Sequence, residues 1–181
     1  AAIKKGTVKP EEYVLFMAHW DHLGTLDNTK PGKDSIVNGA VDNATGVASI
    51  LEFAKRYSGI ETDRSIIFLT VTLEESGLLG SEYFAKYPPI DLSNVVAGFN
   101  FDGIMPTGLT NDMVVVGYGA SELEDLLETE LQKNGRYINP DPNPEKGYFY
   151  RSDHISLAKR GVPMLYSDGG FDFVVGGKEA G

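Results

Sequence analysis

Three largely apolar runs of strand length constrain the fold of this chain more than any other feature. They occupy residues 13–18, 65–72 and 95–101. A strand that is apolar at successive positions, without alternation, is typical of a parallel sheet that is covered on both faces. The runs therefore predict a sheet whose two faces are both buried.

Stretches with helical features separate these runs. Apolar residues recur at every third or fourth position over residues 44–57, which is the pattern of a helix with one buried face. A capping box of Ser121 and Glu124 opens another helix, which reaches about residue 134. We also expect helices over residues 77–86 and 153–160, short strands over 114–116 and 162–166, and a proline-rich loop over 139–147. Strands that alternate with helices predict an α/β fold, a three-layer α/β/α sandwich around a mostly parallel mixed sheet.

Composition limits the kinds of function. The 181 residues fit a single domain (residues 1–181) and carry a formal net charge of −10. Such acidity argues against nucleic-acid binding, because phosphate contacts need clustered Lys and Arg. No apolar run approaches the roughly 20 residues of a membrane-spanning helix. The chain has no cysteine and three histidines, so a metal site would have to combine His with Asp and Glu.

Side chains of the metal-ligand type follow each of the three buried runs. They are His19, the pair Glu74 and Glu75, and Asp102. In open α/β sheets ligands bind at the carboxyl ends of the strands, so these residues are predicted to meet at one edge. Taken singly, each has a plainer interpretation, such as a satisfied polar histidine, a solvated turn or an Asp-Gly turn. Their consistent position at strand ends favours a shared site.

Two further candidates lie at the starts of helices. Asp42 is part of a glycine-rich segment just before the helix over residues 44–57, and alone it would be interpreted as a helix N-cap. His154 lies at the start of the helix over residues 153–160. With these two, five separate fragments of the chain are predicted to converge at the same edge of the sheet.

Taken together, the fragments resemble the M28 family of zinc peptidases, which includes bacterial aminopeptidases. The matching segments occur in the family's order within residues 13–166: AHWDHLG (18–24), NGAVDNATG (38–46), EESGLLGS (74–81), NFD (100–102) and SDH (152–154). The resemblance implies a zinc-exopeptidase-like fold and a zinc-dependent aminopeptidase, a hydrolase that removes N-terminal residues from peptides. It also implies a peptide as the binding partner and an extracytoplasmic location, either periplasmic or secreted.

The resemblance implies a role for each matching residue. One Zn²⁺ ion would be held by His19 and Asp102, the other by Glu75 and His154, and Asp42 would bridge the two. Imidazole and carboxylate groups suit zinc, and a shared carboxylate reduces the repulsion between two close cations. Members of the family also have a cis peptide bond after the bridging aspartate, which here is the bond between Asp42 and Asn43.

Several neighbouring residues would complete the mechanism. Glu74 is the candidate general base, which would take a proton from zinc-activated water and deliver it to the leaving amine. Asp21 resembles the carboxylate that orients the neighbouring imidazole. Tyr148 or Tyr150 is a candidate hydrogen-bond donor to the tetrahedral oxyanion, with packing in the pocket wall as the alternative. His22 matches no ligand position and is predicted to be structural.

The sequence leaves three alternatives open. Glutaminyl cyclases share the fold with one zinc, carboxypeptidases of the family share the metal site, and some receptor ectodomains with this fold are non-catalytic binding modules that have lost ligands. All the candidate ligands and the base are retained here, which favours the peptidase. The chain is shorter than the usual catalytic domains of the family and is predicted to be truncated at one or both ends. The preferred N-terminal residue and the oligomeric state stay open.

Overall fold

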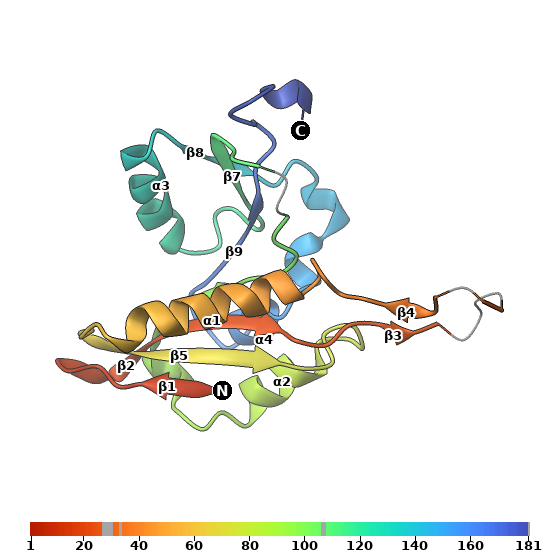
Figure 1. Ribbon diagram of the computed structural model, residues 1–181. Helices are drawn as coiled ribbons and strands as arrows, with labels where there is room; N and C mark the ends of the chain where they lie inside the picture. Colours follow the sequence, from red (N-terminus) through yellow and green to blue (C-terminus); the bar gives the residue numbers. More distant parts are fainter. Residues whose placement is uncertain (27–30, 33, 106–107, 181) are drawn as a thin grey trace.

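The chain folds around a seven-stranded mixed sheet (Figure 1). The structure is a computed structural model that describes residues 1–26, 31–32, 34–105 and 108–180. Across the sheet the order is β1 (Ala2–Lys4), β5 (Arg64–Val71), β2 (Lys9–His19), β6 (Val95–Asn100), β9 (Met164–Gly169), β7 (Asp112–Val115) and β8 (Tyr137–Pro140). In that order the neighbours β5, β2, β6 and β9 are parallel, as are β7 and β8, whereas the pairs β1–β5 and β9–β7 are antiparallel.

Helices cover both faces of this sheet. α1 (Ala44–Ser58) packs on β2 and β5, and Figure 1 shows it on the opposite side of the sheet from α2 (Leu79–Lys86). α4 (His154–Ala158) contacts α2, β6 and β9, and α3 (Leu123–Lys133) packs against β8 and β9. The arrangement confirms the predicted α/β/α sandwich around a mostly parallel mixed sheet.

Strand β2 shows why the apolar runs are continuous. Successive side chains of a strand point to opposite faces of its sheet. Phe16 belongs to the core under α1, where its ring stacks on that of Phe53 at a centroid distance of 5.0 Å. Leu15 and Met17, both fully buried, belong to the core on the other face, together with Leu157 of α4. Because both faces of β2 are covered, every position from Tyr13 to Ala18 is apolar.

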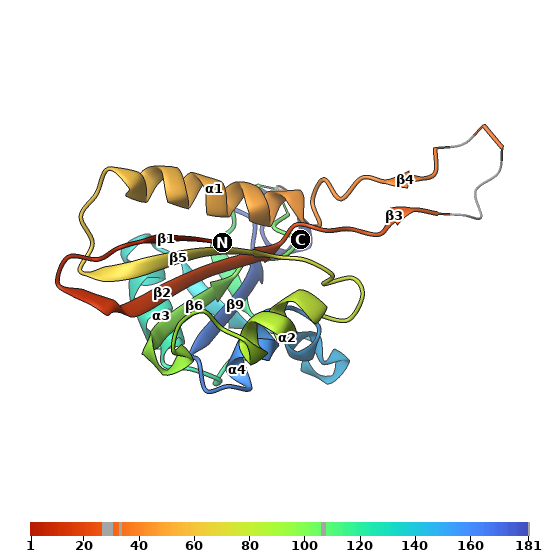
Figure 2. The same cartoon turned by 90° about the horizontal axis from the view of Figure 1, so that it is seen from below.

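A two-stranded ribbon leaves the main sheet near the candidate site. Its strands, β3 (Gly24–Thr25) and β4 (Ile36–Val37), pair antiparallel and project away from the sheet in both views (Figures 1 and 2). Asp21 and His22 precede β3, and Asp42 follows β4. The base of the ribbon therefore carries candidate site residues on both of its connections.

Several predicted boundaries differ from the observed ones. The strand predicted over residues 162–166 spans Met164–Gly169, because its antiparallel pairing with β7 continues to Gly169. The loop predicted over residues 139–147 begins inside β8, an edge strand whose free side accommodates Pro140. Helix α2 begins at Leu79, later than predicted, since Leu78 has a left-handed backbone with φ of 62°. Helix α4 is also shorter than the predicted 153–160.

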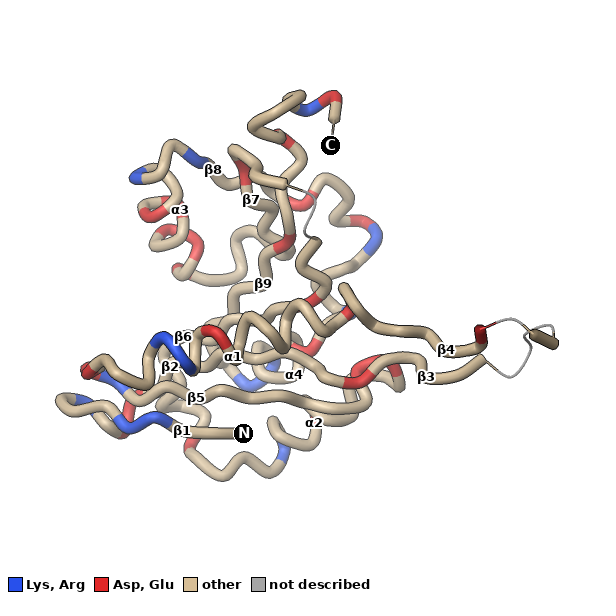
Figure 3. Tube along the Cα trace, in the orientation of Figure 1, with Lys and Arg blue, Asp and Glu red and all other residues tan. Residues whose placement is uncertain are grey.

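Charged residues are distributed unevenly over the fold. Figure 3 shows a group of acidic segments near the start of β3, at the end of the sheet where β2 and β5 finish. Lys and Arg lie at other places, which include β1 and the last turn of α1 with Lys55 and Arg56. Within the described residues, no helix has the length and apolar character needed to cross a membrane.

Candidate metal centre

The candidate ligands lie at the carboxyl-terminal edge of the parallel strands. β2 ends at His19, β6 ends two residues before Asp102, and β5 ends three residues before Glu74. In the register of the sheet His19 pairs with Val71, the last residue of β5, so these two strands finish at the same level. The sheet therefore delivers side chains from three separate strands to one edge.

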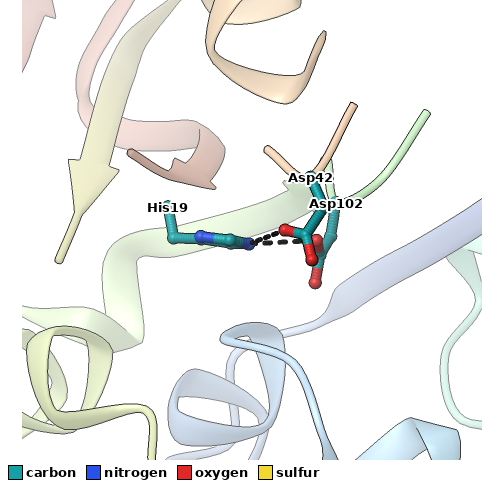
Figure 4. A group of neighbouring side chains, drawn as sticks. All are labelled: His19, Asp42 and Asp102. Atoms are coloured by element: carbon teal, nitrogen blue, oxygen red, sulfur yellow. Dashed lines mark hydrogen bonds and ion pairs between the residues drawn. The ribbon is translucent and has the colours of Figure 1, made fainter. Parts of the chain in front are cut away.

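His19, Asp42 and Asp102 form a first group of possible metal ligands (Figure 4). The Nε2 atom of His19 lies 3.0 Å from Oδ1 of Asp102 and 3.2 Å from Oδ1 of Asp42. Two ligands at the usual zinc distances in tetrahedral geometry are separated by about 3.3 Å, so this spacing fits a shared zinc ion. The Nδ1 atom of His19 lies 3.1 Å from the backbone oxygen of Asp21. When the ring proton is on Nδ1, that N–H donates a hydrogen bond to the oxygen, and the lone pair of Nε2 is free to bind a metal.

The electrostatics of this group are those of a cation site. Burial lowers the pKa of His19, but the hydrogen bond and the charge of Asp102 outweigh it and raise the pKa to about 9. Burial raises the pKa of Asp102, but its hydrogen bonds with His19 and Ser152 lower the pKa below its usual value. The carboxylates thus favour a positive charge at the position of the His19 ring nitrogen.

A buried hydrogen-bond chain fixes the carboxylate of Asp102. Its Oδ2 atom accepts a hydrogen bond of 2.6 Å from the hydroxyl of Ser152. That hydroxyl accepts a hydrogen bond of 2.7 Å from the side-chain amide of Asn100, and both partners are buried. Such outer partners orient the groups that bind a metal. The SDH segment therefore reaches the first group through its serine.

The turn before α1 sets the position of Asp42. The Asp42–Asn43 peptide bond is cis, as the family resemblance implies. The side-chain oxygen of Asn43 accepts hydrogen bonds from the N–H groups of Gly46 (3.0 Å) and Gly103 (3.2 Å), and its amide donates to the carbonyl of Phe101 (2.9 Å). A Cβ atom on Gly46 would lie only 2.3 Å from that same carbonyl oxygen. Helix α1 and the segment after β6 are therefore held in close contact.

His22, Asp42 and Glu75 form a second group, whose candidate ligand atoms lie within 4.8 Å of one another. Asp42 belongs to both groups. The Nδ1 atom of His22 lies 2.7 Å from Oε1 of Glu75, although the two are not aligned as a hydrogen bond. Neither atom has a hydrogen-bond partner among the residues that the structure describes. Because buried polar atoms without partners are costly, the second group is suited to taking up a ligand.

Glu74 lies close to both groups. Burial raises its pKa to about 7, while the charge of His19 opposes the rise. Its backbone N–H donates to Oδ1 of Asp21 over 3.3 Å. The carboxylate of Asp21, expected to orient His19, lies 3.8 Å from Nδ1 of that ring, farther than the Asp21 backbone oxygen. A carboxyl group that titrates near neutral pH is suited to proton transfer.

His154 lies outside both groups. It is fully buried in α4, and its ring packs against those of Phe149 and Tyr166 at centroid distances of 4.9 and 4.8 Å. Burial lowers the pKa of His154 to about 4, which keeps the ring neutral. The resemblance pairs this histidine with Glu75 at one zinc ion. His154 belongs to neither set of candidate ligand atoms, and both of its buried ring nitrogens lack a hydrogen-bond partner among the described residues.

The two candidate tyrosines have different surroundings. Tyr148 lines a cavity of about 370 Å³, together with Tyr166 and Asp168. Tyr150 is 67% exposed and packs edge-on against Phe149. No hydrogen bond links either tyrosine to the ligand groups within the described part of the chain. Tyr148 thus lies in the wall of a cavity, and Tyr150 lies at the surface.

Tyr166 is a residue that the sequence analysis did not select. Burial raises its pKa, and the charges of Asp102 and Asp168 raise it further. Its hydroxyl group therefore stays protonated and remains a hydrogen-bond donor near both the first group and the cavity. A signal was present, because Tyr166 is the last residue of the strand predicted over residues 162–166 and so lies near the strand ends where the other candidates were expected.

Known proteins share this sequence pattern and fold. The sequence model of Peptidase family M28 matches residues 1–173. A probable zinc metalloprotease of Pyrenophora tritici-repentis is 33% identical over 101 residues, which cover 56% of this chain and 23% of that protein. Leucine aminopeptidase 2 of Trichophyton equinum is 27% identical over 135 residues, covering 69% of this chain and 26% of that protein. The chain thus spans about a quarter of the length of these relatives.

Solved structures show the same fold. The aminopeptidase from Aneurinibacillus sp. strain AM-1 superposes with a TM-score of 0.69 at 23% identity, covering 92% of this chain and 37% of that one. The glutaminyl cyclase of Porphyromonas gingivalis superposes with a TM-score of 0.55 at 24% identity, covering 86% of this chain and 56% of that one. At these identities the likeness establishes the architecture, which these enzymes have in common with the present chain.

Proposed function

The chain belongs to peptidase family M28, and from this membership we propose that it carries the active site of a zinc-dependent aminopeptidase that uses two metal ions. The observation that carries the proposal is that Asp42 belongs to both groups of candidate ligands. Two zinc ions about 3.5–4 Å apart can act together on one substrate, and a shared carboxylate suits that spacing. The presence of leucine aminopeptidase 2 among the relatives supports the aminopeptidase activity.

The donor set fits zinc. The first ion would be held by His19, Asp42 and Asp102, and its neutral imidazole and carboxylates are usual zinc ligands. The second ion would be held by Asp42 and Glu75. For this ion the family resemblance adds His154 as a ligand, and His22, the third member of the second group, lies against Glu75.

Glu74 is the proposed general base. Zinc, when bound, lowers the pKa of a water molecule and polarises a carbonyl oxygen. The Glu74 carboxylate would take the proton of the attacking water and return it to the amine of the departing peptide. Its pKa, raised to about 7 chiefly by burial, suits both steps near neutral pH. Tyr148 and Tyr166, in the wall of the neighbouring cavity, are the proposed donors to the substrate carbonyl oxygen.

The acidic surroundings favour the amino end of a peptide. Acidic segments gather at the edge of the sheet that carries the candidate ligands (Figure 3). A free α-ammonium group is attracted by such a rim, and a free α-carboxylate is repelled. Peptides blocked at either end test this choice. Cleavage that survives blocking of the amino end would favour the carboxypeptidase alternative.

Zinc content and hydrolysis of leucyl-p-nitroanilide, measured together, test the proposal. We expect about two zinc ions per chain, and in Glu74→Gln a loss of activity of about 10²–10⁴-fold with the metal retained. Glu82→Gln, at an exposed position of α2, is the matched control and should keep both the activity and the bound zinc. One zinc ion with cyclisation of N-terminal glutamine would instead favour the cyclase alternative. A folded chain that binds no zinc would favour the binding-module alternative.

A further inference from the structure

His22 lies between the two chain segments that carry Glu75 and Asp42. Its Nδ1 atom is 2.7 Å from Oε1 of Glu75, and the two side chains are 19% and 20% exposed. On its other side the histidine meets the turn before Asp42, because a Cβ atom on Gly39 would lie 2.9 Å from Cβ and Cγ of His22. The carbonyl of Gly39 in turn accepts a hydrogen bond of 3.0 Å from the N–H of Ala44 at the start of α1. One side chain therefore contacts both segments.

The distance between His22 and Glu75 distinguishes two roles for the histidine, that of a zinc ligand and that of a residue that positions a ligand. The ligand atoms of one tetrahedral zinc ion are about 3.3 Å apart. In the first group the His19 Nε2 atom lies at similar distances, 3.2 Å from Asp42 and 3.0 Å from Asp102. The 2.7 Å between His22 and Glu75 is shorter than that separation, so the two side chains touch directly, although they are not aligned as a hydrogen bond. We propose that His22 is a positioning residue of the second metal ion, one that fixes the Glu75 carboxylate relative to Asp42. This inference rests on the proposed function, because it presumes an ion between those two carboxylates.

The surroundings of the contact explain why His22 matters for the second ion. The facing atoms of His22 and Glu75 are buried and have no hydrogen-bond partner in the described part of the chain. Without the imidazole, the Glu75 side chain would gain rotational freedom, which ion binding would have to remove. Loss of such an outer partner typically weakens metal binding about 10–100-fold. His19 and Asp102, which complete the first group, lie outside this contact.

The test compares zinc binding by the full chain with that of His22→Ala and His22→Asn. An asparagine at this position places an amide N–H where the Nδ1 atom of the histidine lies, so it can restore the contact with Glu75. Chelator-competition titrations give the two zinc affinities separately. We expect His22→Ala to bind the second ion about 10–100-fold more weakly with an unchanged first affinity, and His22→Asn to recover part of the loss. Circular dichroism of both variants without metal verifies that they fold like the wild type.

The outcomes distinguish this inference from the function on which it rests. A wild-type chain that does not bind two zinc ions contradicts both. A wild-type chain that binds two, with equal second-ion affinity in His22→Ala, overturns the role of His22 alone. Cobalt absorption provides a further readout, because a positioning residue leaves the spectrum of the saturated protein unchanged. A changed spectrum in saturated His22→Ala would make His22 a ligand and would overturn the positioning role.

Discussion

The ring of His19 faces two carboxylates through the nitrogen proposed to bind the first zinc ion. The pKa of this histidine is raised from 6.5 to about 9, since the interactions with Asp102 outweigh the effect of burial. At pH 7 the ring of the protein without metal therefore carries a proton. A zinc ligand must be neutral imidazole, so zinc has to displace that proton. We predict the release of about one proton per chain when the first ion binds at pH 7.

Calorimetric titration with zinc in buffers of different ionisation enthalpy measures this release. The Glu74→Gln variant is the better protein for the experiment, because Glu74 itself titrates near pH 7. Because the pKa of His19 is raised, proton release on zinc binding is largest below about pH 9 and declines above it. Zinc affinity rises with pH up to about pH 9 for the same reason. Zinc binding at pH 7 without proton release would contradict the assignment of His19 and Asp102 as ligands of the first ion.

At the scale of elements, the start of α1 depends on one side chain. Asn43 is buried and makes three hydrogen bonds, which join the first turn of α1 to the segment after β6. Asn43→Ala removes a helix cap and leaves buried backbone groups unpaired, so we predict a loss of about 2–4 kcal/mol in the free energy of unfolding. Urea denaturation measures this loss. Asn134→Ala is the control: it removes a single exposed hydrogen bond at the end of α3, and its cost should stay below about 0.5 kcal/mol.

Elements with a strong local pattern were predictable from the sequence. Helix α1 was predicted over residues 44–57 and spans Ala44–Ser58, because one apolar stripe and a capping residue define it. Strand β1 was not predicted, because its three residues have no pattern of their own and are fixed by antiparallel pairing with β5. Strand β8 likewise depends on its pairing with β7. Such distant pairings are set by tertiary structure, which local sequence does not report.

The candidate site was partly predictable for a similar reason. Parallel strands share one carboxyl edge, so strand ends alone indicated that His19 and Asp102 lie together. Sequence position does not tell which way a side chain points from a helix or a loop. The ring of His154 packs beside Tyr166 and belongs to neither group, whereas His22, predicted to be structural, contacts Glu75. These directions depend on packing between elements that are far apart in the chain.

At the scale of the whole molecule, the proposed ions would join four distant parts of the chain. These are the end of β2, the turn before α1, the segment after β5 and the segment after β6. A ligand that binds the folded state alone stabilises it by about 2.7 kcal/mol at a free concentration of 100 times its dissociation constant. For a chain of this size we predict that zinc raises the melting temperature by roughly 5–10 °C, and that a chelator reverses the rise. Differential scanning calorimetry measures both.

The variant Asp42→Asn shows whether this stabilisation comes from the shared carboxylate. Asp42 belongs to both groups and is 52% exposed, so its replacement should remove most of the effect of zinc while changing the fold without metal only slightly. Magnesium is the second control, because it prefers six oxygen ligands and a site with imidazole does not suit it. If zinc raised the melting temperature of Asp42→Asn as much as that of the wild type, the stabilising ions would lie elsewhere. The two groups would then not form one centre, because Asp42 is the residue through which they are joined.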